Sequence, residues 1–147
     1  MIEMRRGSIA LIDALGFKGL WQRYSPNSII HKLNGMRNSV LRFAQHGDKH
    51  VQHGRTHIIR FLSDSVVIGC HSGNGTEYSQ QELDIDTAGS VAILTNRLIR
   101  SSLHDEPFLL YRGCITTGEY VLDGNFLVGE AVDEAAEAML ESGDVLK

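Results

Sequence analysis

The chain is organised around IALIDALGFK, residues 9–18, in which an apolar run ends in a carboxylate and a glycine. The run Ser8–Ala14 shows no alternation of polar and apolar side chains, which is typical of a central strand buried on both faces. Asp13 lies at the end of that predicted strand, and Gly16 follows it in a predicted turn. We therefore expect a buried strand that delivers a carboxylate into a turn.

A second carboxylate, Asp64, lies at the tip of a predicted hairpin. The segments Thr56–Leu62 and Ser65–His71 are predicted strands, joined by a tight turn at Ser63-Asp64. Mg²⁺ is typically bound by one or two carboxylates and completes its shell with substrate phosphates and water. Backbone N–H groups in the turn after Asp13 are suited to contact such phosphates. The two aspartates together predict chemistry on a nucleoside triphosphate.

Each aspartate also has a simpler explanation when it is taken alone. Asp13 is a suitable cap for the helical segment predicted from Phe17, and Asp64 is a common kind of turn residue. Their joint occurrence, one after a buried strand and one on a hairpin tip, favours the metal site.

The composition is that of a soluble globular protein. The 147 residues are 42% hydrophobic and 22% charged, which suits one domain over residues 1–147 with an ordinary core. The net charge of −4 argues against a nucleic-acid partner. No signal peptide is evident, and no apolar run approaches the roughly 20 residues that span a bilayer. We expect a cytoplasmic protein without a membrane partner.

Cysteine and histidine give little sign of a disulfide or a zinc site. Cys70 and Cys114 are isolated and lie in predicted strands, so free buried thiols are expected. Four histidines crowd one predicted loop and strand without regular ligand spacing, and they suit a polar surface better than the alternative of a zinc site. These four are His46, His50, His53 and His57.

Two long helices are predicted between the strands. After a short helical segment at Phe17–Tyr24, Pro26 begins the first long helix, which ends at about Asp48. Its apolar positions recur at helical spacing. They are Ile29, Ile30, Leu33, Met36, Val40, Leu41 and Ala44. The second helix is predicted to begin at Asp86 or Thr87, after an exposed polar loop at 71–86.

The C-terminal third completes the predicted fold. The stripe of the second long helix comprises Val91, Leu94, Leu98, Ile99 and Ser102. Strands are then predicted at Phe108–Thr116 and Glu119–Val128, the latter broken by a hairpin turn at Asp123–Asn125. Glu130–Glu141 is predicted as the last helix. This order indicates an α+β sandwich of ferredoxin-like type, with helices covering a mainly antiparallel sheet.

Four short motifs resemble those of the class III nucleotidyl cyclases. DALGF at 13–17 is similar to the first metal motif of that family, and Ser63-Asp64 to the tip of the second. RGCITTG at 112–118 resembles the next strand, and FLVGEAV at 126–132 the entry to the helix that faces the dimer partner. They occur in family order across residues 8–141. The short form of the last motif is most similar to bacterial pyrimidine cyclases of the Pycsar antiphage systems.

The resemblance implies two Mg²⁺ or Mn²⁺ ions per site. One would activate the ribose 3′-hydroxyl and the other would neutralise the triphosphate. The implied metal set comprises Asp13, Ala14 and Asp64, of which the two aspartates are the catalytic pair. The phosphates would be bound by backbone groups of Ala14, Leu15, Gly16, Phe17 and Lys18. The implied assembly is a homodimer whose sites are each completed by the final helix of the other subunit, in antiphage signalling.

Base selection is the point at which purine cyclases differ from this chain. Arg60 lies four residues before Asp64, where purine cyclases carry a lysine or glutamate, and strand alternation points it toward the site. Phe126 occupies the position of their base-selecting aspartate. Because the Arg60 fork donates two hydrogen bonds to carbonyl acceptors, UTP is the expected substrate and CTP the weaker alternative. The simpler explanation is that Arg60 is a strand residue whose side chain faces solvent and has no part in base selection.

Two departures from the family leave a second interpretation open. Asp133 and Glu137 stand where the family has an asparagine and an arginine that stabilise the transition state, and carboxylates would repel that charge. The candidates for a substitute cation are Arg97, Arg100 and Arg112. The alternative is a catalytically inactive module for dimerisation or nucleotide sensing.

The last helix also predicts where dimerisation occurs. Its apolar and small residues form a face suited to close packing on another element. They are Ala131, Val132, Ala135, Ala136 and Met139. Cyclase domains usually continue with further strands, whereas this chain ends at Lys147, so its C-terminal part is expected to be shortened or missing.

Overall fold

The computed structural model of the chain describes residues 2–48, 54–73, 77–124 and 126–144. In these ranges the chain has five strands, β1 (Met4–Leu15), β2 (Arg55–Leu62), β3 (Ser65–Ser72), β4 (Leu110–Asp123) and β5 (Phe126–Val128). They form one antiparallel sheet in the order β2-β3-β1-β4-β5.

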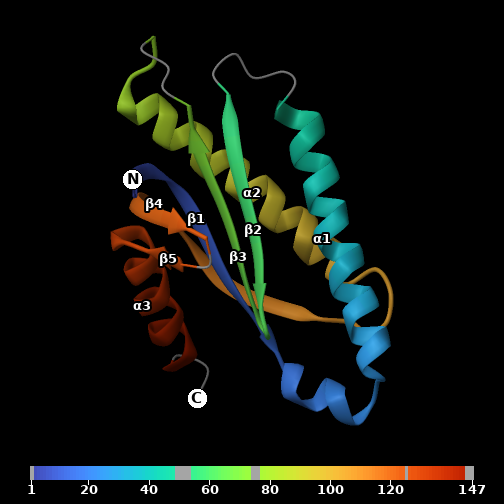
Figure 1. Ribbon diagram of the computed structural model, residues 1–147. Coiled ribbons are helices and arrows are strands. Elements are labelled where there is room, and N and C mark those ends of the chain that lie inside the picture. The colour runs from blue at the N-terminus through green and yellow to red at the C-terminus, as the bar shows by residue number, and fades with distance from the viewer. Residues whose placement is uncertain (1, 49–53, 74–76, 125, 145–147) are drawn as a thin grey trace.

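The helices are α1 (Pro26–Asp48), α2 (Gln80–Ser102) and α3 (Glu130–Asp144), and a 3₁₀ segment, η1, covers Phe17–Gln22. Helices α1 and α2 cover one face of the curled sheet, and α3 lies on the other (Figure 1). The predicted α+β class is confirmed.

Strand β1 is the centre of the sheet, between β3 and β4. Ala10 and Ile12 are buried in the core beneath α1 and α2, whereas Ile9 is buried in the second core, beside α3. Side chains of a strand alternate between its faces, so Asp13 lies on the face of Ile9. The prediction of a central strand buried on both faces is confirmed.

Helix α1 begins at Pro26 as predicted and buries four of the seven apolar positions. These four are Ile29, Met36, Val40 and Ala44, while Leu33 and Leu41 pack partly against the same core. The expectation for Ile30 is wrong, because its side chain is 52% exposed. Successive helical residues lie about 100° apart, so burial of Ile29 turns Ile30 toward solvent.

Helix α2 begins earlier than the sequence pattern predicted. Ser79 is the N-cap, and its hydroxyl accepts from the backbone N–H of Glu82, whose carboxylate accepts from the backbone N–H of Ser79. This reciprocal capping box starts the helix at Gln80, so the predicted start at Asp86 or Thr87 is wrong. The first turn of α2 is polar, and the apolar periodicity used to predict a helix gives no signal for its true start there.

Strand β4 is one continuous strand where two were predicted. Its ladder with β1 runs without a break through Thr117 and Gly118, which pair with Ser8 and Gly7. Only the short strand β5 follows the turn at Gly124, and Asn125 of the predicted turn lies outside the described residues. The long central strand β1 provides partners for the whole of β4, so the expected interruption does not occur.

Helix α3 packs on β4 with the face that was predicted for dimerisation. Ala131 and Ala135 are fully buried, and their carbonyl oxygens accept from Thr116 Oγ1 at 2.6 Å and Cys114 Sγ at 3.0 Å. The prediction is therefore wrong for these two alanines, because their own sheet covers them.

Two further observations concern the cysteines and the helices. Neither Cys70 nor Cys114 is in a disulfide. Cys70 is buried as expected, whereas Cys114 is only partly buried, and this burial raises the pKa of Cys114 above its ordinary value. None of the helices in the described ranges combines the length and apolar composition needed to cross a bilayer.

Candidate functional site

The two predicted metal ligands lie side by side although 51 positions of sequence separate them. The antiparallel register of β1 and β3 places Asp13 opposite Ser65, the residue that follows Asp64. The backbone N–H of Ala14 donates to the carbonyl oxygen of Asp64 at 2.8 Å, and the Ser65 hydroxyl donates to Asp13 Oδ1 at 3.2 Å. The end of β1 and the β2–β3 turn are thus joined by two hydrogen bonds.

The β2–β3 turn holds Asp64 in place through an uncommon backbone conformation. The turn consists of Ser63 and Asp64, between the paired residues Leu62 and Ser65. Ser63 has φ +58°, a left-handed backbone conformation that residues other than glycine and asparagine adopt only at a cost in free energy. A two-residue turn of this kind matches the twist of the flanking strands, so the position of Asp64 is defined by the hairpin.

Tyr111 is a neighbour of both carboxylates that the sequence pattern did not identify. It pairs with Ala14 across β1 and β4 and packs partly against the main core. Burial, followed by the negative charges of Asp13 and Asp64, raises the pKa of Tyr111 to about 12. Tyr111 directly precedes the RGCITTG motif, which could have drawn attention to it. Only the strand register shows that it lies beside the two carboxylates.

The turn after β1 has the predicted glycine but fewer free donors than expected. Gly16 has φ +70° and precedes η1, whose Phe17 is buried in the core at 6% exposure. Lys18 is exposed, and Leu15 is 43% exposed. The N–H of Ala14 donates to the Asp64 carbonyl oxygen, so it is not a free donor for a phosphate in this structure.

Of the three candidate cations, the structure places one beside the carboxylates. Arg112 is the β4 partner of Asp13, and directly opposite residues of an antiparallel pair share a face. Its Nε is shielded from solvent and has no hydrogen-bond partner in the part of the chain that the structure describes. Arg97 and Arg100 instead lie on α2, in a hollow between the helices.

The curl of the sheet brings Arg60 to the turn before Phe126, and these are the two positions that the resemblance assigns to base selection. Arg60 is exposed on β2, at one edge of the sheet, and Phe126 is 72% exposed on β5 at the other. Nevertheless Arg60 Nη2 donates to the carbonyl oxygen of Gly124 at 3.3 Å, in the turn that leads to Phe126. Only one nitrogen of the guanidinium is used in this bond.

The donor set fits a hard cation that binds together with a phosphate ligand. Asp13 and Asp64 are oxygen donors on adjoining elements, as Mg²⁺ and Mn²⁺ prefer. Among the described residues, no three His, Cys, Asp or Glu side chains gather closely enough to hold an ion alone. His46 and His57 therefore form no zinc cluster in that part of the chain, while His50 and His53 lie outside the described residues. A substrate phosphate would have to complete the coordination at the carboxylates.

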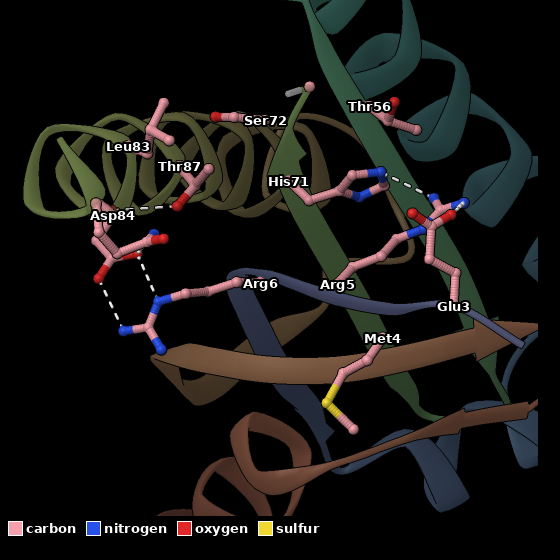
Figure 2. A pocket seen from close by; sticks show the side chains of 12 residues that line it. Glu3, Met4, Arg5, Arg6, Thr56, His71, Ser72, Leu83, Asp84 and Thr87 are labelled. Atoms are coloured by element: carbon pink, nitrogen blue, oxygen red, sulfur yellow. Dashed lines mark hydrogen bonds and ion pairs between the residues drawn. The ribbon is translucent and has the colours of Figure 1, made fainter. Parts of the chain in front are cut away.

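A hollow of about 570 Å³ lies at the opposite end of β1 (Figure 2). Arg6 donates to both oxygens of Asp84 at 3.1 and 2.9 Å, and Arg5 donates to His71 Nε2 at 2.8 Å. Figure 2 shows the two arginines extending in opposite directions from the strand. Asp13 lies eight positions after Arg5, or roughly 26 Å along an extended strand, so this hollow is separate from the carboxylates.

His71 in this network is the basis of a pH prediction. Burial, and then the charge of Arg5, lower the pKa of His71, while Glu3 partly opposes this shift. Since Arg5 donates to Nε2, the neutral ring carries its proton on Nδ1, which donates to Tyr120 Oη at 3.0 Å. Unfolding returns the pKa to about 6.5, so the unfolded chain binds more protons below that pH.

We therefore expect the free energy of unfolding to fall as the pH drops from about 6.5 to the lower pKa that His71 has in the folded state. His71→Gln should remove that part of the slope, whereas the exposed His31→Gln should not. Urea unfolding at about pH 7 and about pH 5 measures the slope. An unchanged slope in His71→Gln would contradict the prediction.

Comparison with solved structures identifies the fold. The structure is similar to the guanylate cyclase domain of RhGC from Catenaria anguillulae in complex with GTP, at TM-score 0.63 and 16% identity over 91% of this chain and 72% of that one. It is also similar to the adenylyl cyclase CyaB from P. aeruginosa, at TM-score 0.53 and 18% identity over 97% and 74% of the two chains. A bacterial light-regulated adenylyl cyclase matches at TM-score 0.58 and 15% identity, over 92% and 69%. The chain has the class III cyclase fold.

The sequence comparisons give no further information. No protein-family model matches the chain, and no curated protein matches it either.

Proposed function

We propose that this chain is a nucleotide cyclase that converts UTP to 3′,5′-cyclic UMP and pyrophosphate. The observation that carries the proposal is the pairing of Asp13 with Asp64 through the 2.8 Å bond from Ala14 N–H to the Asp64 carbonyl. The guanylate cyclase domain of similar fold was solved with GTP, which supports a nucleoside triphosphate as the substrate class.

In the proposed reaction the ribose 3′-oxygen attacks the α-phosphorus of the bound nucleotide. The bond from that phosphorus to the α,β-bridging oxygen breaks, pyrophosphate leaves, and the 3′-hydroxyl proton passes to water. Asp13 and Asp64 would hold two Mg²⁺ or Mn²⁺ ions, which when bound supply positive charge at the attacking and leaving oxygens. The Ser65 hydroxyl, bonded to Asp13 at 3.2 Å, would orient that carboxylate. Exposed Lys18 and the backbone N–H groups from Leu15 to Lys18 would contact the phosphates.

Arg112 is the cation that we assign to the charge of the transition state. Asp133 and Glu137 are exposed on α3 and carry the wrong sign for that role. Arg112 lies opposite Asp13, and its shielded Nε lacks a partner among the described residues, which is the state expected of a donor that serves a ligand. A guanidinium can bind two phosphate oxygens at once.

The proposed base is uracil, and its test is a four-nucleotide competition assay with Mn²⁺. Arg60 has donors left after its bond to Gly124, and both uracil carbonyls accept hydrogen bonds, whereas cytosine offers one carbonyl and an amino group. We expect UTP to react best, CTP weakly, and ATP and GTP hardly at all. Arg60→Ala should lower kcat/KM for UTP roughly 10- to 100-fold, the equivalent of one charged hydrogen bond.

Mn²⁺ binding is the control for that assay, because Arg60→Ala should leave it nearly unchanged. A clear preference for ATP or GTP would refute the base assignment while leaving the cyclase proposal in place. Absence of turnover with every nucleotide would refute both. That outcome would favour the inactive dimerisation or nucleotide-sensing module, for which Asp133 and Glu137 are the supporting observation.

The assembly and setting of the proposed enzyme follow from the resemblance of its motifs. We propose a homodimer in which each site is completed by α3 of the other subunit. The part of the predicted helix face that remains partly or fully exposed is Val132, Ala136 and Met139. The setting we propose is cytoplasmic antiphage signalling, with cyclic UMP as the messenger.

A further inference from the structure

A groove between α1 and α2 concentrates positive charge on the outer side of the helical layer. Two hollows between these helices share Ser39 and Arg97. The groove is lined by Ser39, Arg42 and Phe43 on α1 and by Arg97 and Arg100 on α2, and we call this set the basic groove. It carries three arginines in a chain whose net charge is −4.

Two of the three arginines of the basic groove are held by neutral groups. Arg97 Nε donates to Ser39 Oγ at 3.0 Å, and its guanidinium lies 5.9 Å from the centre of the Phe43 ring. Arg42 Nε donates to the Asn38 carbonyl at 3.3 Å. Across the described ranges, none of the three arginines is in an ion pair with a carboxylate. Their positive charges are therefore uncompensated within the described chain.

The outer face of α3 has the complementary character. Asp133, Glu134, Glu137 and Glu141 are all exposed on one side of that helix, together with Leu140, which is 75% exposed. We call these five residues the acidic stripe. No ion pair joins its carboxylates to a basic side chain in the part of the chain described by the structure.

The two surfaces also match in spacing and in apolar content. Arg97 and Arg100 are three positions apart on a helix, as are Glu134 and Glu137, so each pair rises about 4.5 Å along its axis. Phe43, which is 43% exposed, offers the groove an apolar contact for a side chain such as Leu140. An acidic helix with one exposed leucine therefore fits a groove with three arginines and one exposed phenylalanine.

A single copy of the chain cannot bring these surfaces together. Helix α3 contacts β4, β1 and β5, whereas α1 and α2 cover the opposite face of the sheet (Figure 1). The sheet separates the two surfaces. Any contact between them has to be made by another molecule.

We propose that the basic groove binds the acidic stripe of a second copy of this chain. The contact is heterologous, because each copy offers a groove to one neighbour and a stripe to another. It is open-ended unless the copies close into a ring, so it differs from a two-fold dimer of fixed size. It leaves the face of Val132, Ala136 and Met139 uncovered, so it adds to the proposed two-fold dimer and does not replace it.

The test is sedimentation of the whole chain over a range of concentrations up to about 1 mM, where weak contacts of millimolar Kd are populated. We expect the average mass to rise beyond two copies. The rise should disappear in about 0.5 M NaCl, which shortens the Debye length to roughly 4 Å. A mass that stops at one or two copies at low salt would overturn the proposal.

Two double variants then identify the surfaces. The groove variant carries Arg97→Gln and Arg100→Gln, and the stripe variant carries Glu134→Gln and Glu137→Gln. All four residues are exposed, so both variants should fold. Each variant alone should lose the growth beyond two copies. A labelled stripe variant should nevertheless sediment faster when the groove variant is added, because its intact groove receives the other's intact stripe.

Matched controls separate surface contacts from net charge. The exposed pair Arg23→Gln with Arg37→Gln gives the same net charge as the groove variant, and Glu77→Gln with Glu119→Gln the same as the stripe variant. Both controls should assemble like the unaltered chain. Growth of either blocked variant alone beyond two copies, or no interaction between the two variants in a mixture, would overturn the proposal.

Discussion

The Asp13→Asn and Asp64→Asn variants are expected to lose cyclisation activity by roughly 1,000-fold or more. Each change removes one negative charge with almost no change of shape, so metal affinity falls without a defect in the core. Loss of several kcal/mol of charge stabilisation in the transition state corresponds to a rate effect of this size. The measurement is initial-rate formation of cyclic UMP from UTP with Mn²⁺.

The control for this pair is Asp123→Asn, an aspartate at the exposed end of β4. It makes the same chemical change beyond the carboxylate pair and should leave the rate nearly unchanged. Circular dichroism and sedimentation should show the same fold and oligomer for all three variants. Activity that survives both substitutions at the pair would remove the metal assignment.

The Gly113→Ala variant is expected to destabilise the sheet severely. A Cβ atom at this position would lie 2.1 Å from the carbonyl oxygen of Leu11 and 2.6 Å from Ile12 Cγ2. The clashing oxygen belongs to the central strand, which pairs on both sides and has little freedom to move. Relief of such an overlap costs about 3 kcal/mol or more, a large part of the stability of a small domain. Urea unfolding measures the loss.

Gly35→Ala is the matched control for that variant. The added methyl at Gly35 meets no atom within 4 Å, and the position lies inside α1. Alanine is the better helix former, so the same chemical change should here stabilise the protein by up to about 1 kcal/mol. Equal effects of the two substitutions on the free energy of unfolding would show that the strand contact at Gly113 is unimportant.

Local sequence determined the main elements of this protein. The unbroken apolar run of β1, the two strands around Ser63-Asp64 and the start of α1 at Pro26 were all predicted and are all present. Each depends on residues within about ten positions, where hydrophobic periodicity and turn chemistry are decisive. Predictions failed where the signal was polar, as at the start of α2 at Gln80.

Tertiary structure alone decided which distant residues meet. The opposition of Asp13 to Ser65 and Arg112 follows from strand register, and a shift of one residue would have turned Asp13 to the other face. The bond from Arg60 to Gly124 depends on the curl of the whole sheet. Burial of the alanine face of α3 likewise depends on β4 beneath it. Periodicity tells which face of an element is apolar, but only packing fixes what that face contacts.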